Sequence, residues 1–180
     1  MNTEFVNAEK IAKQSGFTYT AFLDCNTIQL LDEVRDMCKA NTCGQYDKNW
    51  ACPPGCGELE ECREKVAAYT WGLLVQTVGE LEDSMDFEAM VETEKLHKKH
   101  FLKAAEQLRE QYPDMMSLGA GSCILCKECT YPTEPCRFPN KRVSSMEAYG
   151  ILVNDLCTKN NMAYYYGPDK IAYTSCYLLG

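Results

Sequence analysis

Four of the twelve cysteines in this 180-residue chain lie close together, at Cys123, Cys126, Cys129 and Cys136. Two residues separate Cys123 from Cys126 and Cys126 from Cys129. A turning backbone can therefore bring three sulfurs and several amide N–H groups around one small inorganic cluster. The fourth follows residues 131–135, where two prolines limit the directions in which Cys136 can point. This spacing favours a [4Fe–4S] cluster. Cys136 either closes that cluster or reaches a second one.

A second group of cysteines lies upstream, at Cys38, Cys43, Cys52 and Cys56. The chain between and beside them is rich in asparagine, glycine and proline, which suit neither a helix interior nor a central strand. We therefore expect a loop that bound metal would order. The eight cysteines predict two cluster sites, or one site with thiols drawn from both loops. Cys62, on the helix expected to follow, is a spare candidate ligand.

Two other uses of the cysteines compete with iron and sulfide. Disulfides need an oxidising compartment, but residues 1–10 lack the basic start and apolar core of a signal peptide. Structural zinc is the stronger alternative, because four-cysteine sites with C-x2-C pairs are common. The third cysteine at the same spacing favours iron, since a zinc site uses one close pair and then a distant pair.

Charge and length narrow the class of protein. The formal net charge of −8 argues against binding to nucleic acid, whose phosphates would repel the chain. Acidic electron carriers dock on basic partners, so we expect a redox partner protein. No apolar run approaches the ~20 residues that a membrane helix needs, and without an export signal the expected location is the cytoplasm. The length suits a single cysteine-rich metal-binding domain over residues 1–180.

The elements that must position the two loops predict an α+β fold, with three or four helices and a small mixed or antiparallel sheet. Helical character is expected at 7–15, 32–37, 58–68, 85–111 and 145–159, the first two segments being short. Strand character is expected at 17–23, 69–78 and 115–118, followed by a hairpin of 163–166 with 171–179. Segment 69–78 is apolar on both faces, as an interior strand requires.

Glu94 and His97 form a Glu-x-x-His pair on the expected helix 85–111. Glu94 falls in the middle of the apolar face and His97 at its edge. Such a pair could serve a proton relay or a metal site, but a di-iron bundle needs two of these motifs and one exists. We therefore interpret the pair as structural. Three further cysteines are expected to be buried as small apolar side chains: Cys25, Cys157 and Cys176.

The two cysteine loops resemble an uncharacterised prokaryotic family of cysteine-rich, predicted metal-binding proteins, defined as a domain of unknown function. The resemblance is carried by Cys38, Cys43 and the segments 50–54, 119–131, 135–139 and 145–153. It covers nearly the whole chain and implies metal binding, with an iron–sulfur centre expected, in mostly anaerobic organisms. Cys56 lies outside the family's pattern, so Cys62 or a non-cysteine group could replace it as the fourth ligand of the first site.

Three functions are consistent with these residues. The leading hypothesis is electron transfer through one or two [4Fe–4S] clusters. The second is an enzyme or accessory factor in which an incompletely ligated, open iron binds a small molecule. The third is an interaction domain stapled by zinc. Ordinary hydrolase or nicotinamide chemistry is not expected, because no Ser–His–Asp set, phosphate loop or dinucleotide fingerprint is present.

Overall fold

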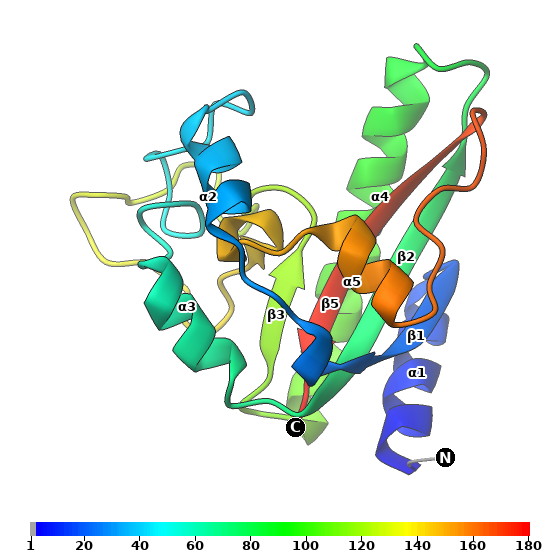
Figure 1. Ribbon diagram of the computed structural model, residues 1–180, viewed down its shortest axis with the longest axis horizontal. Helices are drawn as coiled ribbons and strands as arrows, with labels where there is room; N and C mark the ends of the chain where they lie inside the picture. Colours follow the sequence, from blue (N-terminus) through cyan, green and yellow to red (C-terminus); the bar gives the residue numbers. More distant parts are fainter. Residues whose placement is uncertain (1–2) are drawn as a thin grey trace.

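The computed structural model describes residues 3–180 and has the predicted α+β architecture, built on one five-stranded mixed sheet (Figure 1). The strand order is β1-β2-β5-β3-β4, in which β3 and β4 pair in parallel and the other neighbours pair antiparallel. The strands are β1 (Tyr19–Asp24), β2 (Trp71–Glu80), β3 (Met116–Gly119), β4 (Ser144–Ser145) and β5 (Lys170–Leu178).

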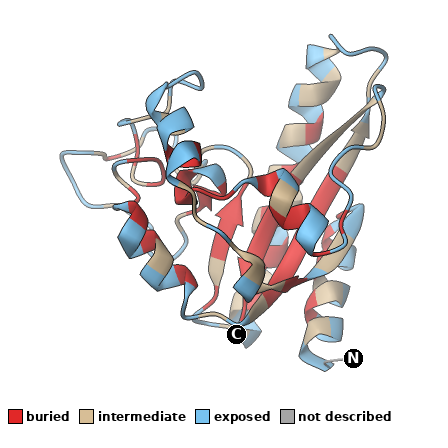
Figure 2. Ribbon diagram, viewed as in Figure 1, coloured by how far each residue is buried: buried red, intermediate tan, exposed pale blue. Residues whose placement is uncertain are grey.

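Two helices cover one face of the sheet, α1 (Thr3–Ser15) and α4 (Phe87–Gln111). Alanines at the helix surfaces allow close approach, and Leu73, Val75 and Tyr177 point from the sheet into this layer of the core. Figure 2 shows the continuous buried stripe that results along the central strands. Within the described range, no helix is both long and apolar enough to cross a membrane.

Shorter elements cover the opposite face: the 3-10 turns η1 (Cys25–Thr27) and η2 (Glu147–Tyr149), with the helices α3 (Leu59–Val66) and α5 (Val153–Lys159). Helix α2 (Asp32–Lys39) packs against η2. Residues 3–180 thus contain five α-helices rather than the three or four expected, because several short segments each form a helix of their own. The prediction that Cys25, Cys157 and Cys176 are buried is confirmed.

The expected helix over 145–159 is wrong in its first half. Residues 144–145 form β4, and α5 begins only at Val153. Gly150 interrupts the helix because it adopts a left-handed φ of 80°, and a Cβ there would lie 2.9 Å from the carbonyl oxygen of Leu31. The next residue, Ile151, then bridges to Leu30. This break turns η2 toward α2 and the cysteine loops.

The expected hairpin of 163–166 with 171–179 is also wrong. Its second half is β5, but this strand lies between β2 and β3 instead of pairing with 163–166. Gln76 holds the first half as a loop, because its side-chain amide donates to the Ala163 carbonyl and its oxygen accepts from the Tyr166 hydroxyl at 2.7 Å. Tertiary contacts have overridden the strand preference of the tyrosines.

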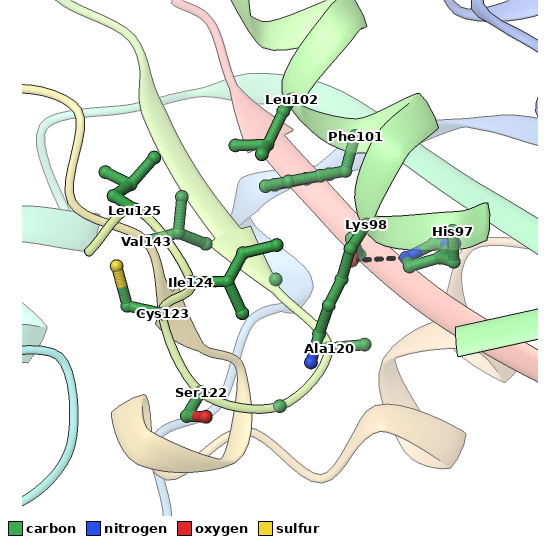
Figure 3. A pocket seen from close by; sticks show the side chains of 13 residues that line it. His97, Lys98, Phe101, Leu102, Ala120, Ser122, Cys123, Ile124, Leu125 and Val143 are labelled. Carbon is green, nitrogen blue, oxygen red and sulfur yellow. Dashed lines mark hydrogen bonds between the residues drawn. The ribbon is translucent and has the colours of Figure 1, made fainter. Parts of the chain in front are cut away.

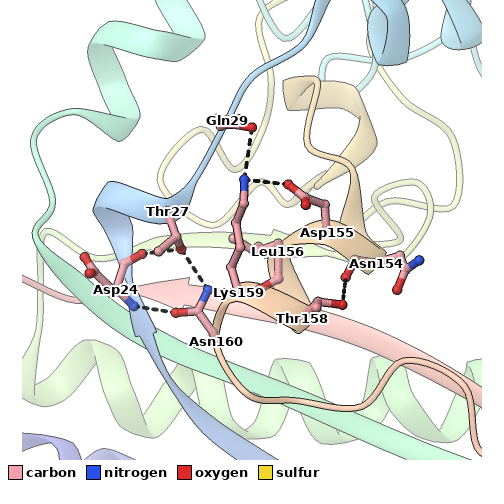
Figure 4. A network of polar contacts seen from close by, with 9 residues as sticks. All are labelled: Asp24, Thr27, Gln29, Asn154, Asp155, Leu156, Thr158, Lys159 and Asn160. Carbon is pink, nitrogen blue, oxygen red and sulfur yellow. Dashed lines mark hydrogen bonds and ion pairs between the residues drawn. The ribbon is translucent and has the colours of Figure 1, made fainter.

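Asn160 ties the end of α5 to the turn that follows β1 (Figure 4). Its side-chain oxygen accepts from the backbone N–H of Asp24 at 2.9 Å. Its amide donates to the Thr27 hydroxyl at 2.8 Å and to the Leu156 carbonyl at 2.9 Å. Because Asn160 is buried, water has little access to these three partner groups and could not readily replace its hydrogen bonds.

We expect Asn160→Ala to lower the free energy of unfolding by about 2–3 kcal/mol, because it leaves several partly buried polar groups without a partner. The matched control is Lys159→Ala, which removes a surface ion pair with Asp155 and is expected to cost less than about 1 kcal/mol. Urea denaturation monitored by circular dichroism measures both. Equal losses in the two variants would contradict the role given to Asn160.

Candidate metal centre

The loop that connects β3 to β4 brings its four thiols to one cavity. Cys123, Cys126, Cys129 and Cys136 all line a space of about 30 Å³, which we call the four-thiol cavity. Each of these residues is partly exposed, so the four thiols lie near the surface of the protein rather than in its core. The remaining walls come from both cysteine loops and include Trp50, Ala51, Leu125, Phe138 and Arg142. The four predicted ligands of the downstream group are therefore brought together.

Local contacts hold this loop in shape. The Thr130 hydroxyl donates to the Pro135 carbonyl at 2.9 Å, and the Arg137 guanidinium donates to the Glu128 carbonyl at 2.8 Å. Ile124 lies next to Val143 in a small apolar pocket against α4, with Cys123 beside it (Figure 3). The turn that carries the cysteines is thus attached to the longest helix of the fold.

Three cysteines of the upstream group line a larger and more polar space. Cys38, Cys43 and Cys52 border a cavity of about 430 Å³, which we call the three-thiol cavity. Its other walls come from four separate parts of the chain and include Gln45, Tyr46, Glu94, Lys98, Ser122 and Glu147. Polar and charged groups therefore face the three thiols across open volume.

Burial sets the protonation of two of these thiols, Cys38 and Cys52. It raises the pKa of Cys38, to which the neighbouring Cys43 and Glu147 contribute further. Burial likewise raises the pKa of Cys52, and the nearby thiols Cys43, Cys38 and Cys123 raise it further. Both thiols are protonated in the metal-free protein at neutral pH. A metal bound by these two thiols as thiolates would therefore displace their protons.

The two cavities are immediate neighbours. Ala51 lines the four-thiol cavity, whereas Cys52 lines the three-thiol cavity. In the downstream loop, Cys123 lines the four-thiol cavity and Ser122 the three-thiol cavity. Adjacent residues are ~3.8 Å apart along the backbone, so the wall between the cavities is thin. Groups bound in the two cavities would lie side by side.

The two cysteine loops lie on the same side of the molecule in Figure 1, and side-chain contacts between them fix this arrangement. The Trp50 indole N–H donates to the Glu134 carbonyl at 3.0 Å, and its ring meets that of Tyr131 edge-on with centroids 4.9 Å apart. The Tyr131 hydroxyl donates to the Asp47 carboxylate at 2.5 Å. Segments more than eighty residues apart in the sequence thereby form one region that carries both cavities.

The structure does not bring Cys56 together with the other three upstream cysteines. Cys56 and Cys62 lie in the core on either side of α3's first turn, and neither lines the three-thiol cavity. The buried Arg35 guanidinium lies 3.7 Å from the Cys56 sulfur and 3.8 Å from the Cys62 sulfur. A hydrogen bond from Cys56, helped by Arg35, lowers the pKa of Cys62 to about 7.

Arg35 itself is held in place by two backbone carbonyls, those of Ala148 and Gly57, each at 2.8 Å. Sequence reasoning did not identify Arg35, because a single arginine on a short helix carries no recognisable signal. The same applies to Lys98. It lies one turn beyond Glu94, and that spacing is the one feature that could have suggested its ion pair with Glu94 at 2.5 Å.

Glu94 and His97 occupy different environments and share no site. Glu94 lines the three-thiol cavity, whereas His97 is fully buried beneath the sheet-facing side of α4. The His97 ring lies between the hydroxyls of Thr77 at 3.0 Å and Ser175 at 2.7 Å, the latter contact being drawn in Figure 3. Its hydrogen-bonding capacity is used within the core.

We expect His97 to make the protein sensitive to acid. Burial, with the nearby charges of His100 and Lys98, lowers its pKa to about 3. Between the ordinary value of ~6.5 and about 3, the unfolded chain binds a proton that the folded chain does not, so stability is lost as the pH falls. The expected loss in unfolding free energy from pH 7 to about pH 5 is about 2 kcal/mol.

Urea denaturation of the wild type and of His97→Gln at both pH values measures this loss. Glutamine can still bond to Thr77 and Ser175 but cannot take up a proton. His100→Gln is the matched control, because His100 is partly exposed and its pKa is lowered less strongly. An unchanged pH dependence in His97→Gln would show that another group is responsible.

All twelve cysteines are free thiols. Across residues 3–180, no set of three or more histidine, cysteine, aspartate or glutamate side chains is drawn together tightly enough to hold a single metal ion. The thiols converge on the two cavities rather than on a preformed position for one ion.

A family profile described as predicted metal-binding protein (DUF2284) matches residues 21–179. The match begins inside β1 and runs past the end of β5, so it includes both cavities and every cysteine that lines them. No curated protein and no solved structure matches the chain. Because the profile covers well over half of its length, the chain belongs to the DUF2284 family of predicted metal-binding proteins.

Proposed function

We propose that this protein is an iron–sulfur protein that holds a [4Fe–4S] cluster in the four-thiol cavity and carries electrons through it. The observation that carries this proposal is the convergence of Cys123, Cys126, Cys129 and Cys136 on one cavity. Four cysteine thiolates are the usual ligand set of such a cluster, and the two x2 spacings match its common binding pattern. When bound, the cluster would supply one-electron redox chemistry.

The surroundings of the four thiols suit a negatively charged inorganic core. Trp50, Leu125 and Phe138 give the cavity apolar walls, and Arg142 places a positive charge beside it. Residues 123–142 contain four basic and two acidic side chains, although the chain as a whole carries a net charge of −8. Local positive charge offsets the charge of a thiolate-bound cluster and tunes its reduction potential.

A redox partner protein would approach the surface of this same loop. Ile124 and Phe138 flank the thiols and are 50% and 44% exposed, respectively. Exposed apolar side chains next to a redox centre provide the contact that a transient partner needs. We propose that the partner docks here, close enough to the four-thiol cavity for direct electron exchange.

A second candidate function arises at the three-thiol cavity. Three thiols rather than four line it, Cys56 lies elsewhere, and about 430 Å³ of open volume faces them. A [4Fe–4S] cluster held by Cys38, Cys43 and Cys52 would keep one iron without a thiolate ligand. Lys98, Gln45 and Tyr46 line the same cavity and could orient a small molecule at that iron.

Anaerobic redox titration tests electron transfer. We expect brown protein whose broad visible band bleaches with dithionite and recovers fully when an oxidised electron acceptor is added. The number of electrons returned should match the number of clusters. Colourless protein that contains zinc and neither bleaches nor returns electrons would replace this proposal with the zinc-stapled interaction domain.

Electron paramagnetic resonance of the reduced protein, with and without cyanide, tests the open iron. Cyanide is a strong iron ligand, so it should change the signal of a cluster that has a vacant position and leave a fully thiolate-bound cluster unchanged. Cys52→Ser serves as the control, because it removes a thiol that lines only the three-thiol cavity. Identical wild-type spectra with and without cyanide would remove this second function.

A further inference from the structure

Another cavity lies at the uncovered edge of β3, and no thiol lines it. Strand β4 pairs only with Leu118 and Gly119, so the outer edge of β3 at Met116 and Ser117 has no neighbouring strand. A cavity of about 200 Å³ fills this position. We call it the arginine cavity; its polar lining includes Arg109, Ser117, Asn140, Arg142, Ser144 and Tyr149.

Two guanidinium groups line this cavity without a counter-charge. Arg109 donates to the Ser117 hydroxyl at 3.4 Å, and within residues 3–180 neither Arg109 nor Arg142 forms an ion pair. Burial lowers the pKa of Arg109, because removing water from the guanidinium makes its charged form less favourable in the folded protein. No carboxylate is present among the residues that line the cavity. A bound anion would offset this desolvation cost.

A buried phenol in the same cavity also lacks a partner. Tyr149 is 5% exposed, and in the described part of the chain its hydroxyl forms no hydrogen bond. Every fully sealed side-chain oxygen or nitrogen in the described residues does have a partner. The Tyr149 hydroxyl therefore opens onto the cavity that the residue lines. Buried polar groups are normally satisfied, so a free donor here indicates a ligand.

We propose that the arginine cavity binds a small oxyanion, a phosphate or a carboxylate, between Arg109 and Arg142 with the Tyr149 hydroxyl as a third donor. Planar guanidinium groups bind both anions through paired N–H bonds. The volume of about 200 Å³ lies below the ~300 Å³ at which pockets for drug-sized ligands begin. The ligand is therefore a single small anion rather than a nucleotide or a peptide.

Arg142 connects this cavity to the four-thiol cavity, because it lines both of them. An anion bound to Arg142 would cancel positive charge beside the four thiols. The binding itself depends only on protein side chains and does not rest on the proposed function. Arg109 and Tyr149 do not line the four-thiol cavity, so they test the anion site without touching a metal ligand.

Isothermal titration of the full-length, anaerobically purified protein tests the proposal, with inorganic phosphate in one arm and succinate in the other at constant ionic strength. We expect saturable binding of at least one anion, and the stronger arm identifies the source. Arg109→Gln should weaken binding at least about 10-fold, and Tyr149→Phe, which keeps the ring, about 5-fold.

Lys141→Gln is the matched control, since it removes one positive charge next to Arg142 from an exposed residue outside the cavity. It should bind as the wild type does. Absence of saturable binding in both arms at anion concentrations up to about 10 mM, a range that covers weak millimolar dissociation constants, would overturn the proposal. Equal weakening by Lys141→Gln and Tyr149→Phe would also overturn it, because general charge would then explain the binding.

Discussion

The Cys126→Ser variant is expected to lose about half of the iron and acid-labile sulfide of the wild-type protein, if each cavity holds one [4Fe–4S] cluster. Cys126 lines the four-thiol cavity and does not line the three-thiol cavity. A serine hydroxyl is a poor ligand for cluster iron because it is harder to deprotonate and less soft than a thiolate. The loss should therefore be confined to one cluster.

Iron and sulfide assays, together with the visible spectrum, measure this loss in anaerobically purified protein. Cys157→Ala is the control, since it removes a fully buried thiol whose pKa burial raises to about 11 and which lines neither cavity. The control should keep its iron although it loses some packing. Wild-type iron content in Cys126→Ser would contradict the placement of a cluster in the four-thiol cavity.

Two variants of the upstream loop are expected to differ strongly in iron content. Cys52→Ser should lose a cluster held in the three-thiol cavity, and Cys56→Ser should keep it. Cys52 lines that cavity, whereas Cys56 points into the core beside Arg35 and Cys62. The two residues are four positions apart in one loop, separated by Pro53, Pro54 and Gly55. They differ in where their thiols point in the folded protein: Cys52 toward the cavity and Cys56 toward the core.

Iron content and the cyanide-sensitive resonance signal report on both variants. Cys56→Ser places a smaller hydroxyl beside Arg35 and should lower the unfolding free energy by about 1 kcal/mol, without a change in iron per folded chain. Loss of the same amount of iron from both variants would mean that Cys56 moves to the cavity when the cluster binds. The three-thiol cavity would then have no open iron.

Residue spacing indicated that Cys123, Cys126, Cys129 and Cys136 would lie close together, because all four belong to one loop, and the structure places all four around one cavity. Whether they bind a cluster stays a prediction. The interior position of β2 was predictable for a similar reason. Its apolar residues lie on both faces, and residues 72–77 are buried, as a central strand requires.

Spacing could not separate Cys52 from Cys56. The direction of each thiol depends on the path of residues 41–57, where Asn41, Gly44 and Asp47 adopt positive φ and reverse the chain several times. The break at Gly150 was missed because the pattern around it also fits a continuous helix. Each error came from a backbone conformation that tertiary contacts select.

The polar walls of the cavities were not predictable from sequence because they are assembled from distant elements. Glu94 and Lys98 on α4 meet Cys52 across the three-thiol cavity. Arg109 near the end of α4 meets Tyr149 of η2 in the arginine cavity. Only the packing of α4 and η2 at the β3 edge brings these side chains together.

Elemental analysis of protein purified without oxygen tests the central claim most directly, with iron, zinc and acid-labile sulfide measured per folded chain. Iron and sulfide should be present in equal amounts, at about four per chain for one cluster and about eight for two, with zinc well below one. Protein with no stoichiometric metal, or with zinc and no sulfide, would contradict the assignment of these thiols to iron–sulfur clusters.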